Sequence, residues 1–184
     1  MIENEFKIML SEAQYALLRD FYEWDDVITQ TNHYFDTDEL DLRARHITCR
    51  TREIAGDYFL QLKLPTDEIF SRVELEKKLD FLPAEIIGEE LRKLAENVDF
   101  PNVKRLGSLR TNRLVKRFHG AEIDLDESEY FGKTDYELEI EFTDENAARK
   151  LLADVLDIIG ENRSEDVVCK GKIQRFIDEF LLLK

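Results

Sequence analysis

Charged and apolar residues alternate along several stretches of the chain, and this alternation predicts β-strands. Successive side chains in a strand point to opposite faces, so residues two positions apart share a face. Near the N-terminus, Glu3, Glu5 and Lys7 would share one face, and Phe6 and Ile8 the other. We expect further strands at residues 30–35, 47–53, 58–64, 72–81, 109–118, 121–126 and 135–142. Most of these strands carry their charges on one face.

Apolar residues at helical spacing separate these strands. Ser11 and Gln14 have the spacing of a capping box, which predicts a helix start followed by an apolar stripe to Phe21. Helices are also expected at residues 85–98, 144–159 and 171–183, with a short one ending near residue 46. Strands interrupted by amphipathic helices indicate an α+β fold with a mainly antiparallel sheet. The length indicates a single domain over residues 1–184.

The charged faces allow two architectures. In an open sheet covered by helices on one side, the charges would simply face water. In a closed antiparallel eight-stranded β-barrel with the amphipathic helices packed outside, they would line a wet interior. Because dry burial of so many charges is prohibitive, that interior must hold a ligand, metal and water. One such cavity explains all the charged faces together, so we favour the barrel. It would be lined by Glu3, Glu5, Glu74, Glu76, Asp124, Asp126, Glu137, Glu139, Glu141, Lys7, Arg50, Arg52, Lys63, Arg72, Arg113 and Arg117.

Composition excludes some functions. The 41 acidic residues outnumber the 26 basic ones, for a net charge of −15. This balance argues against a general nucleic-acid or anionic-membrane binder, although a local basic surface can still bind a small polyanion. Cys49 and Cys169 lack zinc-binding spacing, and the sequence has no P-loop motif, signal peptide or membrane-spanning apolar run. We therefore expect a cytoplasmic protein.

Side chains of both charges in one cavity indicate a specific chemistry. Carboxylates suit Mg²⁺ or Mn²⁺ and not zinc, whereas Arg and Lys suit phosphate oxygens. Phosphoryl transfer depends mostly on positioning and charge neutralisation, which metals and guanidinium groups supply. The charged faces thus predict a site for a metal–polyphosphate complex.

The segment Glu3-Asn4-Glu5-Phe6-Lys7 resembles the N-terminal ExExK signature of the CYTH superfamily, the triphosphate tunnel metalloenzymes. Further matches follow in the family's order at residues 34–37 (YFDT), 50–52 (RTR), 62–63 (LK), 111–113 (TNR), 125–126 (LD), 135–139 (DYELE) and 170–175 (KGKIQR). The resemblance covers nearly the whole chain and is greatest to the small bacterial members. It implies an eight-stranded tunnel that binds a triphosphate and divalent cations.

The resemblance also implies roles for individual residues. The metal-binding acids would be Glu3, Glu5, Glu137, Glu139 and Asp126, with Asp124 as the alternative to Asp126. The phosphate-binding bases would be Lys7, Arg50, Arg52, Lys63 and Arg113, joined by Lys172 and Arg175 near the C-terminus. Glu5, Glu139 and Lys7 are the expected catalytic residues. Glu122 and Glu141 exceed the family's usual acids, and we expect them at the barrel mouth.

Three functions fit these expectations. The first is metal-dependent hydrolysis of a triphosphate, with inorganic tripolyphosphate favoured because no base-reading pocket is identifiable in the sequence. The second is a class IV-like adenylyl cyclase that converts ATP to cyclic AMP and pyrophosphate. The third is a sensor that binds a polyphosphate or nucleotide without turnover, which the complete set of metal-binding acids disfavours. We expect a monomer or homodimer that contains Mg²⁺ or Mn²⁺.

Overall fold

The computed structural model describes residues 2–67, 71–161 and 169–184, with backbone only at residues 2, 3 and 71. Its strands are β1 (Ile2–Leu10), β2 (Asp26–Asp36), β3 (Thr48–Ile54), β4 (Asp57–Pro65), β5 (Ser71–Leu79), β6 (Glu85–Ile86), β7 (Val103–Phe118), β8 (Ala121–Tyr130) and β9 (Lys133–Phe142). Its helices are α1 (Glu12–Phe21), α2 (Asp41–Ala44), α3 (Gly88–Leu94), α4 (Glu145–Ile158) and α5 (Lys172–Leu182). Among these described residues, no helix combines the length and apolar character needed to span a bilayer.

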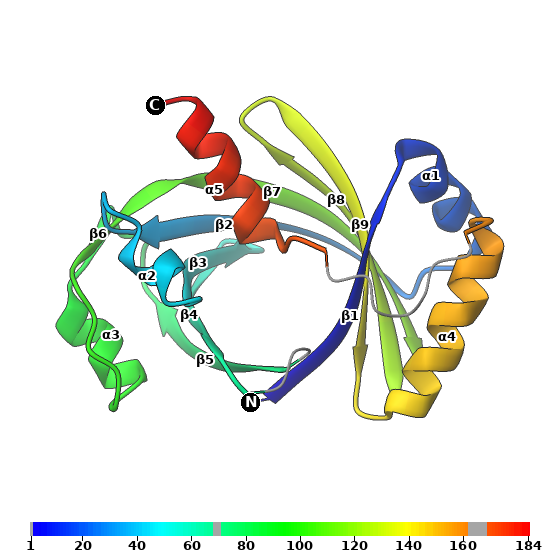
Figure 1. Ribbon diagram of the computed structural model, residues 1–184, viewed down its shortest axis with the longest axis horizontal. Coiled ribbons are helices and arrows are strands. Elements are labelled where there is room, and N and C mark those ends of the chain that lie inside the picture. The colour runs from blue at the N-terminus through cyan, green and yellow to red at the C-terminus, as the bar shows by residue number, and fades with distance from the viewer. Residues whose placement is uncertain (1, 68–70, 162–168) are drawn as a thin grey trace.

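Eight of the strands form a curled antiparallel sheet (Figure 1). The strand order is β2-β3-β4-β5-β1-β9-β8-β7, with the short β6 added to β7, and β2 also pairs with β7. The β2–β7 pairing covers all of Asp26–Asp36, whereas the β1–β5 pairing covers residues 2–4 and 71–73. The α+β fold with a curled eight-stranded antiparallel sheet and five helices is therefore confirmed. Closure of the barrel along its full length stays a prediction.

The apolar face of the sheet points outward, as the alternation predicts. Phe6, Ile8 and Ile140 belong to one buried core, which packs beneath α1 and α4. Leu60 and Leu62 of β4 belong to a second core, with residues of α2 and α3. Since each outward apolar residue alternates with an inward one, these two cores leave the charged residues on the concave face.

Two local signals explain where the long helices begin. The Ser11 hydroxyl accepts a hydrogen bond from the Gln14 backbone N–H, and the Gln14 side chain accepts one from the Ser11 N–H at 2.9 Å. The predicted capping box is thus present. At the start of α4, the Asp144 carboxylate accepts hydrogen bonds from the backbone N–H groups of Asn146 and Ala147.

Two elements differ in extent from the sequence prediction. The helix expected at residues 85–98 is shorter, because β6 occupies its first residues and α3 covers only Gly88–Leu94. Gly88 packs so closely against the backbone of Phe100 that an added Cβ would lie 2.0 Å from the Phe100 carbonyl oxygen. The strand expected at residues 30–35 instead begins at Asp26 and runs to Asp36, where it pairs with β7 throughout.

Helix α5 departs from the expectation that all helices pack outside the sheet. Phe176 and Ile177 form a third buried core with Tyr34, Leu109 and Tyr130. Tyr34 lies on the concave face, since it lines the internal cavity together with the first residues of α5. The sequence pattern gave α5 an apolar stripe but did not reveal which face of the sheet would receive it. The prediction of helices packed only outside was wrong for this helix.

Candidate functional site

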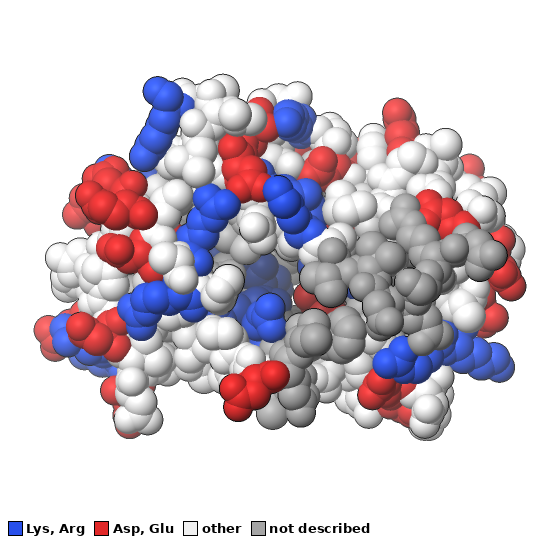
Figure 2. Space-filling model, in the orientation of Figure 1, with Lys and Arg blue, Asp and Glu red and all other residues white. Residues whose placement is uncertain are grey.

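The concave face of the sheet surrounds a cavity of about 310 Å³. Figure 2 shows a hollow near the centre of the molecule with basic side chains inside it. The cavity is lined by residues that include Glu5, Lys7, Gln30, Asn32, Tyr34, Arg50, Arg52, Lys63, Arg72, Arg113, Glu139, Glu141 and Lys172. A second hollow of about 750 Å³ lies toward the β7–β8 turn. Arg52 and Glu141 line both hollows, so the two meet at these side chains.

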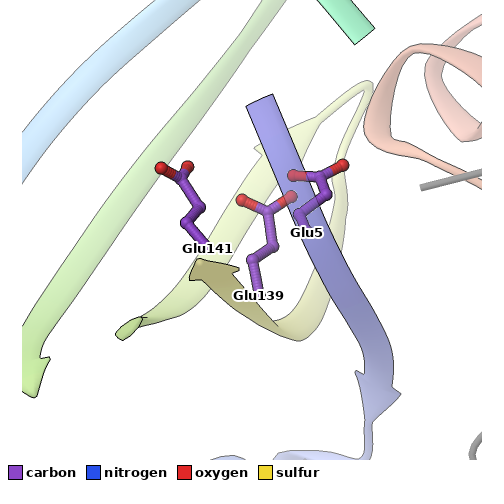
Figure 3. A group of neighbouring side chains, drawn as sticks. All are labelled: Glu5, Glu139 and Glu141. Atoms are coloured by element: carbon purple, nitrogen blue, oxygen red, sulfur yellow. The ribbon is translucent and has the colours of Figure 1, made fainter. Parts of the chain in front are cut away.

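One side of the interior is an acidic wall, formed by Asp124 and Asp126 of β8 and Glu137, Glu139 and Glu141 of β9. Strand register brings these residues together, because Asp126 lies opposite Glu137 and Asp124 opposite Glu139. Three groups of carboxylates have oxygens within 4.8 Å of one another. These groups are Glu5–Glu139–Glu141 (Figure 3), Asp126–Glu137–Glu139 and Glu122–Asp124–Glu141.

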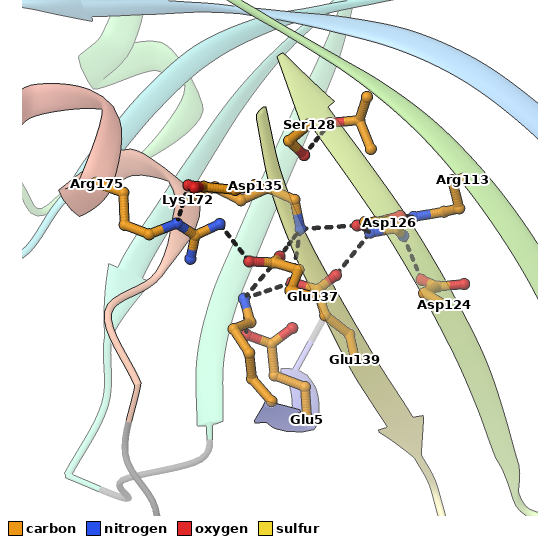
Figure 4. Close-up of polar contacts among 12 residues, drawn as sticks. Glu5, Arg113, Asp124, Asp126, Ser128, Asp135, Glu137, Glu139, Lys172 and Arg175 are labelled. Atoms are coloured by element: carbon orange, nitrogen blue, oxygen red, sulfur yellow. Dashed lines mark hydrogen bonds and ion pairs between the residues drawn. The ribbon is translucent and has the colours of Figure 1, made fainter. Parts of the chain in front are cut away.

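Arg113 of β7 holds the acidic wall together from the neighbouring strand. Its Nε and Nη2 atoms donate to both oxygens of Asp126 at 2.8 and 2.7 Å, a forked contact typical of Arg and carboxylate. Nη2 also donates to Glu139 at 2.6 Å, and Nη1 donates to Asp124 (Figure 4). One guanidinium group therefore donates hydrogen bonds to three of the five carboxylates and lies 3.9 Å from a fourth, Glu141.

Three further basic side chains contact the acidic wall. The Lys7 Nζ atom of β1 forms an ion pair with Glu139, which lies opposite it in the register, and lies 3.4 Å from Glu5. Lys172 at the start of α5 reaches Asp126 at 2.7 Å and Glu139 at 3.0 Å, and also contacts Glu137. Arg175, one turn further on, donates to Glu137. The inward position of α5 thus adds two basic residues to the site.

Burial and ion pairing shift the ionisation of these groups in opposite directions. Burial raises the pKa of Asp124 from 3.8 to about 7, against the attraction of Arg113. Burial also raises the pKa of Glu139, but the charges of Lys7 and Arg113 outweigh it and the net shift is downward. Burial lowers the pKa of Lys7, but Glu139 and Glu5 raise it further, so that the net shift is upward. Glu139 and Lys7 are therefore charged at neutral pH, and Asp124 is near its titration point.

The opposite side of the interior is a basic wall, formed by Arg50 and Arg52 of β3, Lys63 of β4 and Arg72 of β5. All four line the cavity. Arg50 donates to the Gln61 side chain at 2.7 Å, and its Nη2 atom lies 3.7 Å from Glu74. Lys63 lies 3.3 Å from the same Glu74 carboxylate. A single acid of β5 thus serves two cations of this wall.

The structure brings most of the expected site residues together. Eight line the cavity, namely Glu5, Lys7, Arg50, Arg52, Lys63, Arg113, Glu139 and Lys172. Asp124, Asp126, Glu137 and Arg175 join them through the ion pairs described above. The side chain of Glu3 lies outside the described residues, so its role stays a prediction.

The sequence analysis assigned no site role to two residues that line the cavity, although Tyr34 begins one of the matched family motifs. Asn32 and Tyr34 line the cavity from β2 and are neutral, so the search for charged faces passed over them. The sequence feature that could have identified them is that both lie on the same face as Gln30, in the strand that precedes the basic residues of β3. Glu141, expected at the barrel mouth and not among the metal-binding acids, lines both hollows and belongs to two of the carboxylate groups.

The donor set fits a divalent cation. Each carboxylate group offers three oxygens and no sulfur or imidazole, which is the chemistry that Mg²⁺ and Mn²⁺ prefer. In addition, the buried Oδ1 atom of Asp124 has no hydrogen-bond partner within the part of the chain that the structure describes. A buried carboxylate oxygen without a donor is costly, and a bound cation or water would satisfy it.

Known proteins are similar to this chain in both fold and sequence. The family model described as CYTH domain matches residues 1–176, and the chain belongs to this family. A protein of Bacillus subtilis (strain 168), YjbK, whose name proposes a triphosphatase, is 33% identical over 97% of this chain and 95% of its own length.

Two solved structures are also similar over nearly their whole length. A Bacillus halodurans protein proposed to be an adenylate cyclase is 27% identical with a TM-score of 0.75, and the match covers 95% of this chain and 96% of that one. A Hippeastrum protein, proposed as an adenylyl cyclase and described as having a dominant triphosphatase activity, is 26% identical with a TM-score of 0.70. That match covers 96% of each chain.

Proposed function

We propose that the protein is a divalent-metal-dependent triphosphatase that hydrolyses inorganic tripolyphosphate inside the curled sheet, which closes as a tunnel. The observation that carries this proposal is the cavity between an acidic and a basic wall. A triphosphate needs cationic groups along its length and a metal ion against its non-bridging oxygens, and the two walls offer sites for both. The described triphosphatase activity of the Hippeastrum protein supports the same reaction class.

Each wall would have its own task in this reaction. The basic wall, chiefly Arg50, Arg52 and Lys63, would bind the non-bridging phosphate oxygens and align the chain. Mg²⁺ or Mn²⁺, held by Glu5, Glu139 and the other acids of the wall, would supply charge neutralisation and a more acidic water. Lys7, which contacts Glu139, would both orient that carboxylate and donate to a phosphate oxygen.

An adenylyl cyclase is the second candidate, because the Bacillus halodurans relative is proposed to be one. In that reaction a ribose hydroxyl attacks the α-phosphate and pyrophosphate leaves. The same two walls would serve it, since the fold by itself does not select the reaction. A binding protein that senses polyphosphate without turnover is the third candidate.

One assay separates these candidates. The purified protein is incubated with Mg²⁺ or Mn²⁺ and either tripolyphosphate or ATP, with EDTA as the control. We expect orthophosphate and diphosphate from tripolyphosphate and no release in EDTA. Cyclic AMP with pyrophosphate from ATP would support the cyclase instead. Tight binding of either compound without any product would support the sensor.

A further inference from the structure

The amide of Asn32 is buried without hydrogen bonds on the cavity wall. Its side chain has no exposed area, and neither Nδ2 nor Oδ1 has a hydrogen-bond partner among the described residues. Buried polar groups in proteins are almost always paired, and an amide carries both donors and an acceptor. Two buried polar atoms without hydrogen-bond partners do not stabilise the fold, so Asn32 is better explained by a role in binding.

The position of Asn32 suggests what it contacts. In the strand register Asn32 lies opposite Arg52, and Tyr34 lies opposite Arg50. The amide is thus adjacent to the basic wall, because side chains directly opposite in an antiparallel pair lie about 5 Å apart at Cβ. On its other side Asn32 pairs with Leu109 of β7, which offers no polar side-chain atom.

A second asparagine on β7 provides a comparison. The side-chain Oδ1 atom of Asn112 accepts a hydrogen bond from the Thr29 hydroxyl at 3.0 Å, and its side-chain Nδ2 atom donates to Glu127 at 3.4 Å. Asn112 therefore has protein partners for both kinds of polar atom, whereas Asn32 has them for neither. At the position of Asn32 an apolar residue would avoid the cost of burying an unpaired amide.

We propose that Asn32 is a substrate-contacting residue, whose Nδ2 donates to a non-bridging phosphate oxygen and whose Oδ1 accepts from a water or hydroxyl beside that phosphate. This inference rests on the proposed function, because it assigns Asn32 to the same phosphate chain. The arginines of the basic wall can only donate, so Asn32 adds an acceptor that they cannot supply. A condensed phosphate offers an oxygen that accepts from Nδ2, and its bound water can donate to Oδ1.

Access to the amide requires movement of neighbouring side chains. Asn32 lines the cavity but has no exposed area, so a ligand reaches it only after its cover shifts. Arg50 and Arg52 have long, rotatable stems, and a phosphate chain attracts both guanidinium groups. The contact with Asn32 therefore forms as the basic wall closes on the ligand.

Binding of an uncleavable probe tests this contact apart from turnover. The probe is tripolyphosphate with methylene groups in place of the bridging oxygens, measured by calorimetry with Mg²⁺. Asn32→Leu should weaken its binding about tenfold or more, because hydrogen bonds to a charged group are lost. Asn32→Asp should weaken it further through repulsion of the phosphate. Asn112→Leu, the matched control, should bind as the wild type does.

The stability of the ligand-free protein distinguishes a binding role of Asn32 from a structural one. A structural role predicts that Asn32→Leu is less stable than the wild type. The thermal midpoint of Asn32→Leu without ligand should equal or exceed that of the wild type, since an unpaired buried amide is removed. A clear loss of ligand-free stability, or unchanged probe affinity, would overturn the inference. Wild-type hydrolysis of tripolyphosphate with unchanged probe affinity in Asn32→Leu would overturn this inference alone. No probe binding by the wild type would contradict the proposed function as well.

Discussion

The two walls of the cavity are organised differently. The carboxylates of the acidic wall contact basic side chains from three separate elements, which are Lys7 of β1, Arg113 of β7 and Lys172 of α5. In the basic wall, Arg50 and Lys63 share the single carboxylate of Glu74 at 3.7 and 3.3 Å. The acidic wall is thus paired with side chains from three separate elements, whereas the partners described above for Arg50 and Lys63 lie on β4 and β5. The acidic wall is therefore cross-linked by parts of the chain that are far apart in sequence, and the basic wall by strands that follow one another in the sheet.

The largest expected effect comes from breaking the acidic wall at its most connected residue. Glu139 contacts Lys7, Arg113 and Lys172, and it belongs to two of the carboxylate groups. Glu139→Gln removes one negative charge from a candidate metal site and weakens the contacts of three basic side chains with their shared partner. We expect tripolyphosphate turnover to fall by about 1,000-fold, the upper range for loss of one electrostatic catalytic contact.

The control for this substitution is Glu129→Gln on the exposed surface of β8. It makes the same chemical change without touching the interior, and it should leave turnover unchanged. Circular dichroism should show that both variants keep the fold. If Glu139→Gln retained near-normal turnover, the acidic wall would have no part in the reaction.

An intermediate effect is expected on stability, at Asp124, whose pKa lies near 7. Because the pKa of Asp124 rises from 3.8 to about 7 on folding, the folded state keeps a proton that the unfolded chain loses. Its contribution to stability is therefore greatest below about pH 4, falls as the pH rises to about 7, and is constant above that. Between pH 5 and 8, Asp124→Asn should gain about 2–3 kcal/mol relative to the wild type.

Urea unfolding in EDTA at both pH values measures this gain. EDTA is needed because a bound cation would itself favour the ionised form of Asp124. Asp154→Asn on the exposed surface of α4 makes the same chemical change outside the cavity and controls for the loss of one carboxylate. An equal stability difference between wild type and Asp124→Asn at pH 5 and pH 8 would contradict the assigned burial effect.

The smallest effect is expected in the basic wall, where neighbouring cations can substitute for one another. Arg52→Ala should raise the KM for tripolyphosphate about tenfold, since one charge-assisted contact is lost while Arg50 and Lys63 remain. Arg110→Ala removes an exposed arginine of β7 and should leave KM unchanged. Steady-state kinetics of the two variants provide the comparison. Equal KM values would show that Arg52 does not contribute to substrate binding.

Much of this site could be predicted because a strand imposes a strict two-residue period. Once Glu5, Lys7 and Glu139 are assigned to strands, their shared inward direction follows from parity and their proximity from register. The partners of α5 could not be predicted this way. Its apolar stripe must be buried. However, its partners Tyr34, Leu109 and Tyr130 are isolated apolar residues on otherwise polar strand faces, so the sequence did not mark them as a core. Asn32 was missed because a neutral residue does not reveal whether its hydrogen bonds are satisfied.

The alternation in β9 also constrains how this protein can change over evolutionary time. Glu137, Glu139 and Glu141 face the cavity, while Leu138 and Ile140 between them are fully buried in the core beneath α4. Inserting or deleting one residue within β9, between its start at Lys133 and Glu137, would exchange the two sets, placing carboxylates under the helix and aliphatic groups in the cavity. Length changes in such a strand are compatible with activity only in pairs of residues or within a bulge, so the β8–β9 turn is where insertions can accumulate.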